Sequence, residues 1–388
     1  MEASSILQGL SNVPKDILRN KSARIMIVSD PQDYHSLAVS NALKLKGAEH
    51  GFWYLADYPT QQTGSSWIGP GVERWEIDGP GCDLLHGMAP SAVWMRRPGQ
   101  PVLPSGIAAV DHPIAFRECR AFLNGLQQQV GTGSFWVNSP ASFLRATSKL
   151  EQLRAAVSRG FRIPDTLMSN DPRHIHDFIT QSGRVVYKSF YPALWVTGSG
   201  VAATFSTPLS VEDLPDDETL RATPGIYQVI VPKLFELRIT IMGRHVFAAR
   251  IDSQSVPSAS FDWRAARERV PIVPFELPEP LAAACSRLME DLGLVFGCLD
   301  LIVTPDLEYV FLEVNEMGAF LWIEEQNPEI RLLSPFCELL LQGRPDFIWN
   351  PATTNLRLED VHQDAVRDVR RAATERRHVL RPPAAMQE

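Results

Sequence analysis

Cysteine is scarce in this sequence, and its five copies are odd in number and far apart: Cys82, Cys119, Cys285, Cys298 and Cys337. With no CxxC pair among them, the pattern argues against a disulfide framework and a zinc site, and it suits a reducing compartment. We expect buried, unreactive thiols. The sequence also lacks an apolar run of membrane-spanning length and the basic-then-apolar order of a signal peptide. These absences predict a cytoplasmic protein with no membrane partner.

Positive charge is also in short supply. The chain has 37 Lys and Arg against 45 Asp and Glu, a formal net charge of -8. This balance argues against a general nucleic-acid binder, so we expect no nucleic-acid partner. The 388 residues are 45% hydrophobic and 21% charged, which is ordinary for a globular enzyme of two or three domains.

Glycine is missing where a dinucleotide site would need it. Residues 23–29 predict a buried strand, residues 34–46 a helix and residues 49–55 a second strand, which is a βαβ opening. The turn after the first strand, residues 30–33, reads DPQD. Without a glycine there, a pyrophosphate could not approach the backbone, so a Rossmann cofactor site is disfavoured.

Glycine and proline gather instead in residues 60–81, which predict a loop-rich excursion before a strand at residues 92–95. We place the end of a first domain near Ser134. From residue 141 the chain becomes richer in helices. Helices are predicted at residues 149–159, 172–181, 281–292 and 329–341, and strands at residues 184–190, 227–231, 236–242 and 245–251.

Residues 297–322 carry the most informative pattern. Two β-branched-rich runs, residues 298–303 and 309–314, predict strands joined by a turn. Because side chains alternate along a strand, Glu313 and Asn315 share one face, and Asp300 on the paired strand can point the same way. Two carboxylates and an amide are oxygen ligands that Mg²⁺ accepts. The alternative is a hairpin whose acids face water.

Lysine and arginine stand where phosphate groups could meet them. Lys188 ends an apolar strand and precedes a loop containing Gly198 and Gly200, which could fold over bound phosphates. The alternative for Lys188 is a strand-end lysine beside a tight turn. Arg238 and Arg250 fall on neighbouring predicted strands, where guanidinium groups could stabilise a transferring phosphoryl group. Their alternative is cross-strand ion pairing, with Glu236 and Asp252 as available partners.

The remaining features favour no site. His174 and His176 lie two positions apart on a predicted helix and therefore point apart, and we treat all nine histidines as structural. The tail from residue 353 mixes arginines with acids, which predicts a solvated helix followed by disorder. Docking of an acidic partner is the alternative for this tail.

The order of these parts resembles the ATP-grasp superfamily. The order runs through Lys149, Lys188, a YQVIV hinge, Arg238, Arg250 and the three predicted metal ligands. More narrowly, several short motifs in one order look like the ATP-grasp peptide maturases of the microviridin or graspetide type. These motifs are VWMRRP, WVNSP, KLEQLRAA, IPDTLMSNDP, VVYK, KLFELRITIMG, VFAARIDSQ, DWR, LDLIV, FLEVN and LWIEEQ.

The resemblance implies an α/β and α+β fold in which a βαβ pre-ATP-grasp domain precedes two ATP-grasp subdomains. Its implied boundaries are residues 1–135, 136–225 and 226–345, with a polar, partly disordered tail at residues 346–388. It implies ATP and Mg²⁺ as cofactors. Lys149 and Lys188 would bind the nucleotide phosphates, and Asp300, Glu313 and Asn315 would bind Mg²⁺. Gln228 and the backbone of Ile230 would contact the adenine, and Glu236 would lie near the ribose. Arg238 and Arg250 would contact the transferred phosphoryl group.

The implied reaction forms an acyl phosphate from a side-chain carboxylate and ATP, then captures it with a hydroxyl or amine of the same precursor peptide, made of leader and core. A homodimer is left open. The maturases commonly read PNGQW after the asparagine, whereas this chain has EMGAF at residues 316–320. Two alternatives therefore stand beside peptide crosslinking: an ATP-grasp ligase joining free amino acids or small metabolites, and a non-catalytic nucleotide-binding protein.

Overall fold

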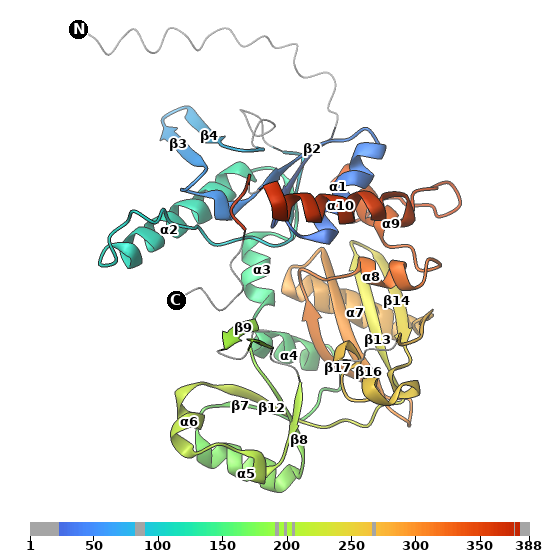
Figure 1. The fold of residues 1–388 in the computed structure, drawn as a ribbon. Coiled ribbons are helices and arrows are strands. Elements are labelled where there is room, and N and C mark those ends of the chain that lie inside the picture. Colours follow the sequence, from blue (N-terminus) through green and yellow to red (C-terminus); the bar gives the residue numbers. More distant parts are fainter. Residues whose placement is uncertain are drawn as a thin grey trace, which may run out of the picture.

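The structure is a computed structural model that describes residues 23–81, 90–190, 194–197, 200–203, 206–265, 269–375 and 377–380. Within these residues the chain forms three larger sheets and two separate strand pairs. Figure 1 shows an N-terminal α/β unit at one end, a small sheet with α5 and α6 at the other, and a larger antiparallel sheet between them.

The N-terminal unit confirms the predicted βαβ opening. Its elements are β1 (Arg24–Val28), α1 (Tyr34–Leu45) and β2 (Glu49–Trp53). Strand β1 lies between β2 and β5 (Ala92–Met95), and β6 (Phe135–Val137) completes a parallel sheet in the order β2-β1-β5-β6. The carboxyl ends of parallel strands meet at one edge, so the residues that follow β1, β5 and β6 lie close together.

The prediction of a loop at residues 60–81 was wrong. The segment forms a hairpin of β3 (Thr63–Gly69) and β4 (Val72–Asp78). Its physical reason is the position of the breakers: Pro70 and Gly71 make a two-residue turn between Gly69 and Val72, and Gly71 takes φ of 74°. The flanking residues are therefore free to pair. The sequence interpretation also did not anticipate α2 (His112–Val130), the long helix beneath this hairpin.

The middle of the chain forms a small antiparallel sheet in the order β11-β8-β12-β7. One face packs on α5 through Ile175, Ile179, Val185 and Tyr227. Because side chains alternate, Lys188 and Gln228 lie on the opposite face. The elements here are α3 (Pro140–Ala146), α4 (Lys149–Ser158), β7 (Thr166–Ser169), α5 (Pro172–Ser182), β8 (Val185–Lys188), β9 (Leu194–Thr197), β10 (Gly200–Ala203), β11 (Thr207–Leu209), α6 (Asp217–Ala222) and β12 (Gly225–Val229). Gly198, in the predicted phosphate cover, lies outside the described residues.

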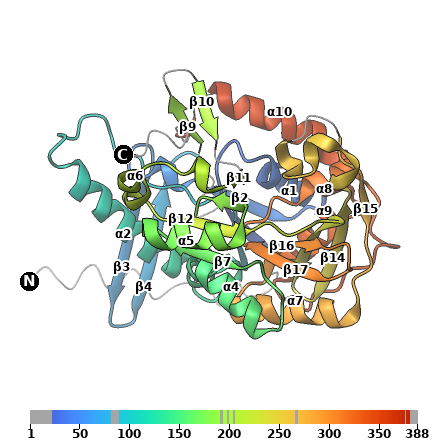
Figure 2. The same ribbon diagram turned by 90° about the horizontal axis from the view of Figure 1, so that it is seen from below.

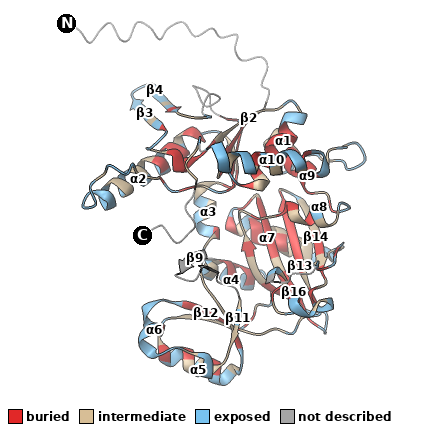
Figure 3. Ribbon diagram, in the orientation of Figure 1, coloured by how far each residue is buried: buried red, intermediate tan, exposed pale blue. Residues whose placement is uncertain are grey.

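The larger sheet is antiparallel, in the order β15-β14-β13-β16-β17. One face packs on α4 and α7, and the other shares a core with the N-terminal unit, α8 and α9. Figure 3 shows dense burial along this sheet, and Figure 2 shows the sheet from below. The predicted helix at residues 329–341 begins later, at Leu333. The elements are β13 (Phe235–Met242), β14 (His245–Ile251), β15 (Ile272–Pro274), α7 (Glu279–Leu292), β16 (Phe296–Val303), β17 (Tyr309–Asn315), α8 (Leu321–Gln326) and α9 (Leu333–Gln342).

The tail contains the predicted helix, α10 (Glu359–Glu375), but this helix is only partly solvated. It packs on α1 and buries Val361 and Ala365, and Asn41 donates to Asp368 at 3.0 Å. The predicted disorder at the chain end falls outside the described residues. Short 3-10 turns complete the fold: η3 (Leu55–Asp57), η5 (Val211–Asp213), η6 (Ser253–Ser255), η7 (Pro257–Ala259) and η8 (Trp263–Ala265).

Two further expectations can be compared with the structure. Cys119, Cys285, Cys298 and Cys337 are free thiols, the last three of them buried, whereas Cys82 lies outside the described residues. Among the helices of the described residues, none is long and apolar enough to cross a membrane.

Candidate active site

A row of charged side chains crosses three adjacent strands of the larger sheet. In the strand register, Arg238 on β13 lies opposite Asp300 on β16, and Asp300 lies opposite Glu313 on β17. Arg238 Nη1 donates to both Asp300 carboxylate oxygens at 2.7 Å, and Asn315 Nδ2 donates to Asp300 Oδ2 at 2.8 Å. The structure thus brings the three predicted metal ligands together on one face, with one predicted phosphoryl-contacting arginine beside them.

A β-bulge lies within this row. The pairing of β16 with β17 shifts between Asp300 and Leu301, so that Leu301 pairs with Phe311 instead of Leu312. A bulge twists a strand locally and re-aims its side chains. Here it lies directly beside the pair of carboxylates, whose strands are otherwise rigidly paired.

Helix α4 brings Lys149 to the same row. Lys149 is the first residue of the helix, and its Nζ donates to Glu313 Oε2 at 2.6 Å. Gln152, one turn later, is 1% exposed; its Nε2 donates to the carbonyl of Val314 at 2.8 Å and its Oε1 accepts from the Val314 amide at 2.9 Å. These bonds fix α4 against β17 and so fix the position of Lys149.

Lys188 comes from the small sheet. Its Nζ donates to Gln228 Oε1 at 2.7 Å, and Gln228 Nε2 donates to Thr166 Oγ1 at 3.0 Å. Gln228 is 4% exposed, and Ile230 follows directly after the end of β12. The predicted phosphate-binding lysine and the predicted adenine-contacting segment therefore lie on adjacent strands, facing away from α5.

Electrostatic interactions link the two sheets. Burial alone would raise the pKa of Glu313, but Lys149 and Lys188 hold this pKa below its ordinary value. Burial lowers the pKa of Lys188, and Glu313 opposes that shift. Glu313 is consequently an anion at neutral pH, and it interacts with the charges of a lysine of α4 and a lysine of the small sheet. Cations placed this way suit a polyanionic ligand.

Glu236 shares the face of Arg238, two residues before it on β13, and it accepts from Lys233 Nζ at 3.0 Å. Arg250 does not. It lies opposite Leu237, so its side chain is on the other face of the sheet from Arg238. Its Nε donates to Asp252 Oδ1 at 2.6 Å and its guanidinium lies 4.2 Å from the centre of the Phe235 ring. Arg250 thus forms an ion pair, but with a residue two positions along the chain and not across the strands.

Arg264 is a cation that the sequence interpretation assigned no role. Its Nη2 donates to Asp262 Oδ2 at 2.8 Å. This bond raises the pKa of the Arg264 guanidinium, and the charges of Glu313 and Asp300 raise it further. Arg264 therefore interacts electrostatically with the carboxylates of Glu313 and Asp300. The DWR motif at residues 262–264 was the sequence signal that could have identified it.

The donor set fits a magnesium ion. Carboxylates from Asp300 and Glu313 and an amide from Asn315 are hard oxygen donors, and Mg²⁺ typically keeps waters and substrate phosphates as its other ligands. In the described part of the chain, no group of three or more His, Cys, Asp or Glu side chains could hold a metal ion without other donors. The amide and a phosphate-bearing ligand would therefore have to complete the coordination.

No protein-family model and no curated protein matches the sequence. Solved structures do match. A RiPP-associated ATP-grasp ligase from Chryseobacterium gregarium, in complex with ADP and a leader and core peptide, has 27% identity and a TM-score of 0.72, covering 84% of this chain and 98% of that one. The macrocyclase MdnC from Microcystis aeruginosa, bound with precursor peptide MdnA, has 28% identity and a TM-score of 0.70, covering 82% and 99%.

A third match, the macrocyclase MdnB from the same organism, has 24% identity and a TM-score of 0.67, covering 82% of this chain and 99% of that one, and it supports the fold alone. All three align over nearly their full length. The chain thus resembles the ATP-grasp ligases that act in peptide maturation, both in its fold and in the order of its motifs.

Proposed function

We propose that this chain is an ATP-dependent, ADP-forming ligase that activates a side-chain carboxylate of a ribosomally made precursor peptide and joins it to a hydroxyl or amine of the same peptide. The product is an ester or amide crosslink. The observation that carries the proposal is the row of Arg238, Asp300 and Glu313, with Asn315 beside it and lysines from two other elements converging on it.

We also propose the finer domain organisation that the resemblance implies. The N-terminal unit would be a pre-ATP-grasp domain, ending near residue 135. The small sheet would form the central subdomain, to residue 225, and the larger sheet the C-terminal one, to residue 345. Lys188 and Gln228 lie on the face of the small sheet away from α5, and the charge of Lys188 lowers the pKa of Glu313 in the larger sheet. The nucleotide would therefore lie between the two sheets.

Each site residue has a proposed role. Lys149 and Lys188 bind phosphate oxygens, which requires Lys149 to exchange part of its contact with Glu313 for the nucleotide. Gln228 and the backbone of Ile230 contact the adenine, and Glu236 contacts the ribose. Arg238 stabilises the transferred phosphoryl group, with Arg264 as a second guanidinium near the carboxylate row. Arg250 would need a change of side-chain position to take the same role, since it lies on the other face.

The chain's contribution to the chemistry is charge stabilisation and positioning. Asp300, Glu313 and Asn315 would hold Mg²⁺, which when bound offsets the charge of the phosphate oxygens. The attacking oxygen comes from the substrate carboxylate, which takes the γ-phosphoryl group of ATP as ADP leaves. The peptide's own hydroxyl or amine then displaces phosphate from the acyl phosphate and releases a proton. No nucleophile from the enzyme is needed.

The proposal is tested by incubating the enzyme with ATP, Mg²⁺ and the short peptide encoded beside its gene, expected to be rich in Thr, Ser, Asp and Glu near its end. We expect products lighter by one water per bond formed, with ADP released in step, because capture within one bound peptide is effectively unimolecular and outruns hydrolysis. Mild base distinguishes the bonds, since esters open and amides persist.

A reaction without ATP and one with Glu313→Gln serve as controls. ADP release stimulated by free amino acids, with the peptide unchanged, would instead favour the small-molecule ligase. Nucleotide binding with no turnover on either substrate would favour a non-catalytic protein.

A further inference from the structure

The loop between Asn315 and α8, residues 316–320, is held by side chains from distant parts of the chain. The carbonyl of Glu316 accepts from Asn138 Nδ2 at 2.9 Å, and that of Met317 accepts from Arg96 Nη1. The carbonyl of Ala319 accepts from Arg238 Nη2 at 3.0 Å and from Trp322 Nε1 at 2.9 Å. An irregular loop beside a site is ordinarily mobile, whereas the carbonyls in this one have fixed donors.

Two of these donors come from the N-terminal unit. Arg96 directly follows β5 and Asn138 directly follows β6, so both stand at the carboxyl edge of the parallel sheet. Each is only 2% exposed. This edge is where parallel sheets of this kind ordinarily bind a ligand. Here the backbone of residues 316–317 occupies the donors at that edge.

Arg96 is itself held by a buried carboxylate. Its Nε donates to Asp33 Oδ2 at 3.2 Å and its Nη2 to Asp33 Oδ1 at 3.3 Å. Asp33 is the N-cap of α1, where it also accepts from the Ser36 amide at 2.9 Å. A paired, fork-shaped guanidinium is a rigid donor. Arg96 therefore fixes the loop relative to α1 and β5.

Asn138 joins the loop to the start of β16. Its Oδ1 accepts from the amides of Val295 at 2.8 Å and Phe296 at 3.0 Å, and its Nδ2 also donates to the Phe296 carbonyl at 2.7 Å. Every hydrogen-bonding position of this amide is used. Asp300 lies four residues further along the strand that Asn138 fixes.

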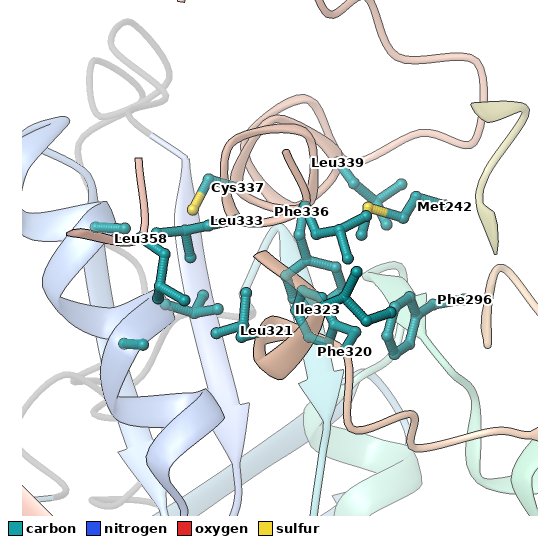
Figure 4. Close-up of a cluster of buried hydrophobic side chains, with 14 of the residues drawn as sticks. Met242, Phe296, Phe320, Leu321, Ile323, Leu333, Phe336, Cys337, Leu339 and Leu358 are labelled. Carbon is teal, nitrogen blue, oxygen red and sulfur yellow. The ribbon is translucent and has the colours of Figure 1, made fainter. Parts of the chain in front are cut away.

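The far end of the loop is fixed by packing. Phe320 is fully buried, with its ring centre 5.2 Å from that of Phe296 and 4.9 Å from that of Phe336, and Figure 4 shows these side chains in one cluster.

The middle of the loop is also tightly packed. Gly318 lies against Cys298, because a Cβ at Gly318 would lie 2.5 Å from the Cys298 sulfur. The Gly318 amide donates to the Asn315 carbonyl at 3.1 Å, which ties the loop to a proposed metal ligand.

We infer that Arg96 and Asn138, at the carboxyl edge of the N-terminal sheet, are positioning residues that hold the loop of residues 316–320 and through it set Asn315 and Asp300 for Mg²⁺. The N-terminal unit thus supports the proposed metal site through these two side chains. The inference rests on the proposed function for the metal site and for the identity of the metal.

The test uses the full chain with Asn138→Leu, which removes all of the amide's bonds at similar volume, and Arg96→Lys, which keeps the charge beside Asp33 but loses the fork. Hydrogen exchange of the amides in residues 316–320 is measured first. We expect both variants to exchange faster there by about tenfold, the factor expected for one lost hydrogen bond. Binding of AMPPNP is then titrated calorimetrically with Mg²⁺, and we expect the half-saturating Mg²⁺ concentration to rise by about the same factor.

Asn41→Leu is the matched control, because Asn41 is a buried asparagine of the same unit that bonds Asp368 of α10 and does not touch the loop. It should lower thermal stability without changing loop exchange or Mg²⁺ dependence. Unchanged exchange and Mg²⁺ dependence in folded Asn138→Leu and Arg96→Lys would overturn the inference, as would equal changes in Asn41→Leu. Binding of AMPPNP by the unmodified enzyme with no Mg²⁺ dependence would count against the proposed function, and exchange alone would then decide the inference.

Discussion

At the scale of single residues, Glu313 links the elements of the site. It accepts from Lys149 at 2.6 Å, lies opposite Asp300 across the strands, and keeps its charge because Lys149 and Lys188 lower its pKa. Replacing it with glutamine keeps the shape and removes the anion. We expect Glu313→Gln to reduce ADP formation by about a hundredfold or more, because a proposed metal ligand and the charge partner of Lys149 are lost together.

The measurement for Glu313→Gln is ADP release at saturating ATP and Mg²⁺, with circular dichroism to check the fold. Asp306→Asn is the matched control: it lies exposed in the turn between the same two strands. Full turnover by Glu313→Gln would remove the metal assignment.

His35 gives the molecule a dependence on pH. Burial, together with Arg96, lowers its pKa from 6.5 to about 3, so the folded ring stays neutral while the unfolded ring titrates normally. Between these values the unfolded chain binds a proton that the folded chain does not, so the free energy of unfolding falls as pH falls, by about 1.4 kcal/mol per pH unit.

The measurement is urea denaturation at pH 7 and pH 5. His35→Gln removes the titrating ring and should lose less stability between these pH values, by about 2 kcal/mol. His174→Gln, at a side chain that is 65% exposed, is the control and should behave as the unmodified protein does. Equal pH dependence in all three proteins would contradict the assignment.

At the scale of elements, the contact of α4 with β17 determines where Lys149 stands. Gln152 is the one-turn neighbour of Lys149 and bonds both backbone groups of Val314 as well as the Ala146 carbonyl at 2.6 Å. We expect Gln152→Leu to lower the free energy of unfolding by about 2 to 3 kcal/mol, because it leaves buried backbone groups unpaired. Nucleotide affinity should fall with it, since Lys149 loses its fixed position.

Denaturant titration and calorimetric nucleotide binding measure these two effects. Arg154→Ala, on the exposed face of the same helix, should change neither by more than about 0.5 kcal/mol. A stable Gln152→Leu variant with unchanged nucleotide affinity would show that Lys149 does not depend on this contact.

Helices and strands with a strong local pattern could be predicted from the sequence. The face of the sheet on which a side chain lies could be predicted only where the pairing register of the strands was considered. β14 has the predicted bounds, His245–Ile251. The placement of Arg250 beside Arg238 overlooked the two-residue turn at Gly243 and Arg244, which pairs Met242 with His245 and therefore puts Arg250 opposite Leu237. Turn length carries this information, so the sequence could have indicated it.

Contacts between distant segments were beyond such prediction. Asn138 and Glu316 are separated by 178 positions, and no local pattern relates an asparagine after one strand to a carbonyl in another unit. Arg264 likewise comes near Glu313 only through the tertiary fold. Motif order suggested the set of site residues, whereas their supports required the structure.

At the scale of the whole molecule, the N-terminal unit packs against the last described helix, α10. The core of the N-terminal unit includes residues of α8, α9 and α10, so the first α/β unit is completed by the last helix. Tyr34 on α1 bonds His362 on α10 at 2.8 Å, and Lys46, the residue after α1, pairs with Glu338 on α9 at 2.7 Å. In Figure 1, α10 lies against α1 at the end of the molecule opposite the small sheet.

The last prediction follows from this closure. Val361 on α10 is 1% exposed, within the core that also contains Leu37 and Ala38 of α1. Val361→Asp would bury an unpaired carboxylate, so we expect the free energy of unfolding to fall by about 3 kcal/mol or more. Gln363→Asp makes the same residue at an exposed position of the same helix and should have little effect. Thermal denaturation of both variants is the measurement. Equal melting temperatures would mean that α10 is the solvated tail that its composition suggested, and the N-terminal unit would then have to be stable without it.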